Sequence, residues 1–228
     1  MNPTLRKLES MAIRIPARES AQFFFGDNVE GYFEGFTHST ARGSGYWLDG
    51  QPLFRDIAVH DGTRRLPHDT ALRADILPHA IRHFHPTAVD EISILHRRRA
   101  VAVRVQSPRR ARIGAELLFD AGAGTPRLEA RGADFLATFP GHALKAGIAA
   151  SLGVRHEPAA PLNGQPSLAF RTRCAACRLV VYLAFDSSPA RALAKARRLR
   201  DENALAAHAR DIAGLLSRSQ VATGDADY

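Results

Sequence analysis

Hydrophobic and polar residues alternate one by one through most of the chain, from about residue 20 to residue 186. Successive side chains of a β-strand point to opposite faces, so a period of two predicts strands with one buried face. Val101, Val103 and Val105 share one predicted face, while Arg104 and Gln106 occupy the other. The pattern favours strands throughout this region.

Turn residues divide the region into short strands. A turn at residues 96–98 joins two alternating segments into a hairpin, and a third strand, residues 113–119, stops at the loop of residues 120–126. Further strands are predicted at residues 128–130, 135–139, 168–172 and 179–185. Because strands follow one another at roughly ten-residue spacing without intervening helices, the sequence predicts a mainly β fold, an antiparallel, supersandwich-like β-sandwich, and not a parallel α/β sheet.

The period changes after residue 186. Ser188 and Pro189 supply a capping side chain and a proline at the first helical position, so a helix is predicted to begin there. Apolar residues then recur at helical spacing to Leu216, which predicts an amphipathic helix whose packing partner lies outside the chain. We therefore expect a fragment of a longer protein, with an N-terminal extension (1–18), a β-sandwich domain (19–186) and a helical linker (187–228) that leads towards an absent catalytic domain.

The composition is that of a globular protein, with 45% hydrophobic and 24% charged residues. No run approaches the roughly 18 to 20 apolar residues that cross a bilayer, and the first residues lack a secretory signal. A cytoplasmic location without a membrane partner is therefore expected. Two cysteines provide no disulfide framework.

The net charge of +8 raises the question of an anionic partner. The densest basic stretch, residues 96–112, has no aromatic residue interleaved to stack on bases, and no helix-turn-helix or zinc-finger spacing surrounds it. A solvated turn and polar strand face is the favoured interpretation, and nucleic acid is not a favoured partner. A basic β module that binds polyanions or nucleic acid stays open as the alternative function.

Cys174 and Cys177 form a C-x-x-C pair between two predicted strands. A structural zinc site needs four ligands, and no second pair lies nearby. The pair is therefore predicted to be two reduced thiols at the ends of a hairpin loop.

Histidines gather between His60 and His85. In a strand, His83 and His85 would share a face, and alternating histidines can chelate a transition metal. Polar histidines at the surface or at a domain interface are the favoured interpretation, so we predict neither a metal nor a cofactor. An enzyme with a metal site in this stretch is the remaining alternative. The common motifs of serine hydrolases, zinc proteases and nucleotide-binding proteins are absent from the sequence.

The most distinctive segment runs from Phe25 to Phe36 and continues through residues 40–48, where glycines stand among aromatic residues. Such glycines suit bulged strands with closely approaching backbones. This segment, the strand pair DEISILHRRRAVAVRVQS and the final LLSRSQVATGDADY together resemble the N-terminal β-sandwich of bacterial glycogen-debranching-enzyme-like glycoside hydrolases of the amylo-α-1,6-glucosidase type.

In that family a helical linker and a catalytic barrel of paired α-helices follow the sandwich. The resemblance implies that the two carboxylates of glycoside hydrolysis lie outside this chain, so no catalytic residue is expected here. It also implies a non-catalytic accessory domain that supports the barrel of an α-glucan-processing enzyme and is inactive alone. Gly31–Tyr32 and Arg42 match family positions. Tyr32, Arg42, Tyr46 and Trp47 are the candidate contacts to an α-glucan or to the neighbouring domain, with core packing as the competing role of the aromatic residues.

Overall fold

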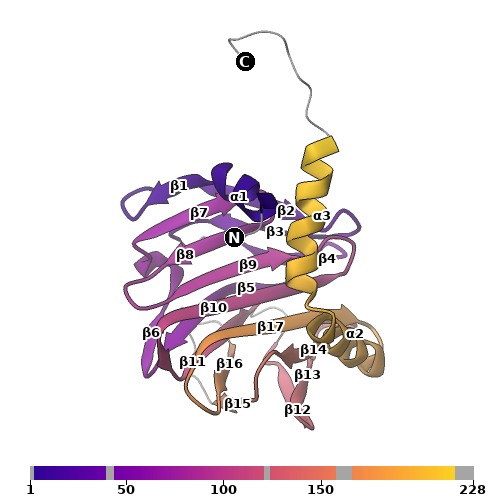
Figure 1. The fold of residues 1–228 in the computed structure, drawn as a ribbon. Coiled ribbons are helices and arrows are strands. Elements are labelled where there is room, and N and C mark those ends of the chain that lie inside the picture. Colours follow the sequence, from indigo (N-terminus) through magenta and orange to yellow (C-terminus); the bar gives the residue numbers. More distant parts are fainter. Residues whose placement is uncertain (1–2, 40–43, 121–123, 158–165, 219–228) are drawn as a thin grey trace, which may run out of the picture.

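The computed structural model describes residues 3–39, 44–120, 124–157 and 166–218, with side chains from residue 6 onwards. Two antiparallel sheets pack face to face, and three helices lie on the outer side of one of them (Figure 1). The prediction of a mainly β antiparallel sandwich followed by C-terminal helices is confirmed.

The nine-stranded sheet contains, in spatial order, β1 (Ile13–Pro16), β7 (Arg73–Leu77), β8 (Ala80–Phe84), β9 (Val89–Ile94), β10 (Ala100–Ala111), β17 (Ala176–Asp186), β14 (Lys145–Ala150), β13 (Asp134–Thr138) and β12 (Arg127–Arg131). The eight-stranded sheet contains β15 (Val154–Glu157), β16 (Ser167–Thr172), β11 (Ile113–Phe119), β5 (Gln51–Asp61), β4 (Gly45–Leu48), β3 (Gly31–Phe36) and β2 (Gln22–Gly26), with β6 (Arg64–Leu66) paired to β5. The helices are α1 (Pro3–Ser10), α2 (Pro189–Asp201) and α3 (Ala204–Arg218), and the 3-10 turn η1 (His68–Thr70) connects β6 to β7.

The main hydrophobic core fills the space between the sheets. Val101, Val103 and Val105 of β10 all point into it and are fully buried, as the alternation predicted. The expected hairpin is also present, with Val101 opposite Ile94 of β9. After β10 the chain crosses to the other sheet, where the predicted third strand is β11. The sequence pattern predicted no separate strand for β1, β5, β6, β7, β14 or β15, and it did not predict α1.

A glycine brings α2 onto the nine-stranded sheet. The helix begins as predicted, with Pro189 in its first turn and the Ser188 side chain accepting a hydrogen bond from a backbone N–H of that turn. Beneath it, Gly147 of β14 is so close that an added Cβ would lie 2.2 Å from the carbonyl oxygen of Ala192. Only a residue without a side chain allows the helix and the strand to approach this closely.

The last helix packs on the same chain. α3 crosses the outer face of the nine-stranded sheet and reaches α1 (Figure 1). Leu205 packs with Tyr182 of the sheet, while Ala209 and Ala213 pack with Leu8 of α1. The expectation that the partner of this amphipathic helix lies outside the chain is therefore wrong for most of the helix, because the sheet and α1 cover Leu205, Ala209 and Ala213, while Leu215 stays 39% exposed.

His208 holds α3 to the sheet in a way that requires a neutral ring. Its Nε2 is 3.1 Å from the carbonyl oxygen of His79, and its Nδ1 accepts the backbone N–H of His96 at 3.3 Å. A protonated Nδ1 could not accept that bond. Burial lowers the pKa of His208 to about 4.

This shift predicts a loss of stability in acid. Since the folded-state pKa lies below the unfolded value of about 6.5, the contribution of His208 is complete above pH 6.5 and declines as the pH falls to about 4. We expect a slope of about 1.4 kcal/mol per pH unit and a total near 3 kcal/mol. Urea unfolding between pH 7 and pH 4 measures this dependence. The His208→Gln variant should lose this part of it, and identical pH profiles of the two proteins would contradict the assignment.

Candidate functional site

Three aromatic rings form a row on the outer face of the eight-stranded sheet. Phe24, Tyr32 and Trp47 come from the adjacent strands β2, β3 and β4. The ring centroids of Phe24 and Tyr32 are 5.3 Å apart, and those of Tyr32 and Trp47 are 6.0 Å apart with only 8° between the planes. Phe23 and Phe33 beside them point into the core, so alternation directs this row, the aromatic stripe, away from it.

The aromatic stripe combines apolar faces with hydrogen-bonding groups. Phe24 is 64% exposed, and Tyr32 and Trp47 are half-buried. Glu34 lies opposite Phe24 in the β2–β3 pairing. Partial burial and the Glu34 carboxylate raise the pKa of Tyr32, so its hydroxyl stays protonated near neutral pH. A surface of this kind can stack on the apolar face of a sugar ring and hydrogen-bond to its hydroxyl groups.

The structure separates the four residues that the sequence singled out. Tyr32 and Trp47 lie directly opposite each other in the β3–β4 pairing. Tyr46 points to the other face, is 0% exposed and stacks with Phe185 in the core at 5.4 Å. Arg42 lies outside the described residues. Sequence reasoning missed Phe24, because three consecutive phenylalanines in β2 hide which of them faces outwards.

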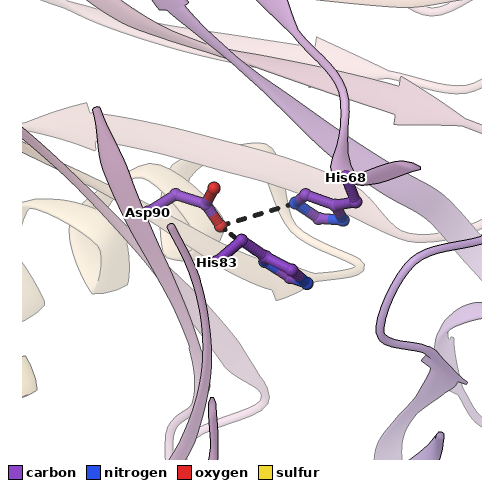
Figure 2. Close-up of side chains that lie close together, drawn as sticks. All are labelled: His68, His83 and Asp90. Carbon is purple, nitrogen blue, oxygen red and sulfur yellow. Dashed lines mark hydrogen bonds and ion pairs between the residues drawn. The ribbon is translucent and has the colours of Figure 1, made fainter. Parts of the chain in front are cut away.

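A second constellation is buried between the two sheets. His68 of η1, His83 of β8 and Asp90 of β9 converge there (Figure 2). The Oδ2 atom of Asp90 is 2.9 Å from Nδ1 of His83 and 3.4 Å from Nε2 of His68. The two imidazole rings stack with their centroids 3.7 Å apart. We refer to these three residues as the histidine–aspartate cluster.

Two further side chains hold the cluster in place. Asp56 of β5, in the opposite sheet, accepts a hydrogen bond from Nδ1 of His68 at 2.7 Å. His85 lies 2.9 Å from the second carboxylate oxygen of Asp90 through its Nε2. The cluster therefore contacts both sheets. The prediction that the histidines of this stretch lie at the surface or at a domain interface is wrong: His60, His68, His79, His83 and His85 are all buried within the chain. His68, His83 and His85 are enclosed between the two sheets, His60 contacts Glu116, and His79 contacts His208 of α3.

The charges of the cluster are strongly coupled. Burial alone would lower the pKa of His68, but the carboxylates of Asp56 and Asp90 outweigh it and raise the pKa to about 10. Burial and the adjacent charge of His68 lower the pKa of His83 to about 4. Burial opposes the ionisation of Asp90, yet the two histidines hold its pKa well below the usual range. Near neutral pH, a charged His68 thus bridges two carboxylates and stacks on a neutral His83.

The basic stretch does not form one patch. Arg97–Arg99 lie at one end of β10 and Arg109–Arg112 at the other, about 40 Å apart along the extended chain. Between them Arg104 pairs with Glu91. Arg98 and Arg99 pair with carboxylates too, so their charge is partly compensated.

Cys174 and Cys177 are exposed free thiols. The prediction that they end a hairpin loop is wrong, because β16 belongs to the eight-stranded sheet and β17 to the nine-stranded sheet, so the chain crosses between the sheets here and Cys177 lies within β17. Among the described residues, the histidine–aspartate cluster is the group whose ligand atoms converge closely enough to hold a metal ion, and it contains neither cysteine.

The chain has no matching protein-family model and no matching curated protein. Its fold is similar to part of a bacterial glucoamylase solved with acarbose, at a TM-score of 0.52 and 8% identity, covering 83% of this chain and 35% of that one. A second similar structure is a protein assigned as a kojibiose phosphorylase from the human microbiome, at a TM-score of 0.49 and 11% identity. The alignment covers 90% of this chain and 39% of that one. A third is heparinase III, at a TM-score of 0.43 and 10% identity, where the alignment covers 79% of this chain and 36% of that one.

The chain thus spans well under half the length of each of these carbohydrate-active enzymes. At this identity, the similarity to the glucoamylase shows the β-sandwich fold alone. Within the described parts of the chain, every helix is too short or too polar to span a membrane.

Proposed function

We propose that this chain is a non-catalytic accessory β-sandwich of an α-glucan-processing glycoside hydrolase of the glycogen-debranching type. The observation that carries the proposal is the coverage: 83% of this chain superposes on only 35% of a bacterial glucoamylase. The sandwich would then be one part of a larger cytoplasmic enzyme and would support its helical catalytic barrel. The family resemblance of the Phe25–Phe36 segment points in the same direction.

The aromatic stripe is the surface through which such a domain would contact an α-glucan. Phe24, Tyr32 and Trp47 offer three neighbouring ring faces on a rigid sheet, and Glu34 provides a hydrogen-bond acceptor beside them. Rigid aromatic side chains give a large contact area at a small entropic cost. The competing occupant of the stripe is the neighbouring domain of the same enzyme.

Glucan binding tests this role. We expect the purified chain to be retarded by glycogen during affinity electrophoresis, and the double variant Tyr32→Ala, Trp47→Ala to weaken binding by about tenfold, since two stacking contacts of roughly 0.5 to 1.5 kcal/mol each are lost. Leu72→Ala, which alters an exposed apolar residue just before β7 of the other sheet, is the control and should bind like the parent.

Unchanged retardation of the double variant would remove the stripe from the proposal. Hydrolysis of glycogen or maltooligosaccharides by the chain alone would contradict the accessory role itself.

A further inference from the structure

The histidine–aspartate cluster has the donor set and the spacing of a metal site. One ligand atom from each of its three residues lies within 4.8 Å of the other two. Zinc bonds to imidazole nitrogen and carboxylate oxygen are about 2.0–2.2 Å long, so neighbouring ligand atoms of a tetrahedral site lie about 3.3 Å apart. The distances of 2.9 and 3.4 Å from Asp90 Oδ2 to the two ring nitrogens bracket this value.

The surrounding residues orient these ligands as the outer partners of metal sites do. The Nδ1–H group of His68 is bound to Asp56, which directs the Nε2 atom of the ring towards Asp90. A carboxylate that binds the far nitrogen of a ligating histidine is a common feature of zinc sites. His85 binds the other oxygen of Asp90, leaving Oδ2 directed at His68 and His83.

The cluster also contains a ligand atom that the protein itself leaves without a hydrogen bond. Nε2 of His68 is buried, and its nearest acceptor, Oδ2 of Asp90, is 3.4 Å away and forms an ion pair with it but no hydrogen bond. Buried polar groups usually find a partner, because an unmade hydrogen bond costs free energy. This atom lies beside two buried carboxylates, Asp56 and Asp90, so a divalent cation bound to it would also offset negative charge.

We propose that His68, His83 and Asp90 bind one divalent transition-metal ion of the zinc class inside the sandwich. Nitrogen donors select zinc, cobalt or nickel over magnesium and calcium, which prefer oxygen ligands. Three protein ligands leave a fourth position, which a water molecule would fill. The ion would tie β8 and β9 to the turn η1, which carries the chain from one sheet to the other.

Binding must change the arrangement of the two rings. Their centroids are 3.7 Å apart and their planes differ by 16°, whereas two imidazoles bound to one tetrahedral ion diverge from it. Metal binding would therefore turn one ring out of the stack. This change gives a signature that can be measured without any substitution.

The first experiment uses the unaltered protein. After chelator treatment and dialysis, we expect Zn²⁺ to bind at one ion per chain by isothermal titration and elemental analysis, and to raise the unfolding temperature. Co²⁺ should give the visible absorption of a four-coordinate nitrogen and oxygen site, while Mg²⁺ and Ca²⁺ should have no effect. In imidazole ¹H–¹⁵N spectra, Zn²⁺ should shift the His68 and His83 signals and leave His142 unchanged.

Substitutions then locate the site. Asp90→Asn and His83→Gln should abolish binding, Asp56→Asn should weaken it about 10- to 100-fold, and the partly exposed His142→Ala control should bind normally. Absence of Zn²⁺ binding to the unaltered protein would overturn the proposal. The cluster would then be a network of hydrogen bonds and ion pairs without a metal ion. Full binding by both ligand variants, or shifts confined to other histidines, would also overturn it. If the ligand variants fail to fold, the imidazole spectra of the unaltered protein with and without Zn²⁺ show whether His68 and His83 bind the ion. None of these outcomes depends on glucan binding.

Discussion

The Gly147→Val variant is expected to lose about 3 kcal/mol or more of folding stability. The first side-chain carbon would lie 2.2 Å from the Ala192 carbonyl oxygen and 2.6 Å from the Leu193 Cα atom, both of which belong to the backbone of α2. Side-chain rotation cannot relieve a contact with backbone, so the helix must move off the sheet. Urea unfolding followed by circular dichroism measures the loss.

Gly214→Ala is the matched control for this substitution. Gly214 lies in α3, and the nearest atom to an added Cβ is the end of the Arg218 side chain, 4.0 Å away. Because alanine favours the helix by up to about 1 kcal/mol, this variant should be as stable as the parent or more stable. A Gly147→Val protein with the parent's stability would mean that α2 does not rest on β14 as described.

The second large effect is expected at Asp90. In metal-free protein, Asp90→Ala should reduce the free energy of unfolding by about 3 to 5 kcal/mol, because the buried charge of His68 loses one of its two carboxylates. Chemical unfolding at pH 7 in the presence of a chelator measures this. Glu129→Ala, which removes the carboxylate of an exposed pair with Arg131, should cost less than about 1 kcal/mol. Equal losses in the two variants would contradict the charged, buried state of the cluster.

Much of the fold could be predicted where one face of a strand meets the core and the other meets solvent or polar groups. Val101, Val103 and Val105 gave the orientation of β10 correctly for this reason. β14 was not predicted because its residues 146–150 are apolar on both faces: one face packs into the inter-sheet core and the other lies under α2. Its sequence therefore shows no alternation, and a buried strand of this kind carries little local signal.

Only part of the histidine–aspartate cluster could be predicted from the sequence. Alternation placed His83 and His85 on one face, but burial of that face follows from the packing of the second sheet. The β8–β9 register, which sets His83 opposite Asp90, depends on the length of the turn between them. His68 reaches the cluster from a connection between sheets, and Asp56 reaches it from β5. Contacts between residues this far apart in the sequence produce no periodic pattern from which they could be predicted.

The position of β17 has a consequence for how the protein is made. Among the described residues, this strand is the last in sequence; it lies between β10 and β14 and is the sole link there between the two halves of the nine-stranded sheet. While a ribosome is still synthesising residues 176–186, the earlier strands can form only two partial sheets with unpaired edges. Open edges invite pairing with other chains. The nascent polypeptide is therefore expected to need protection by a chaperone until β17 emerges.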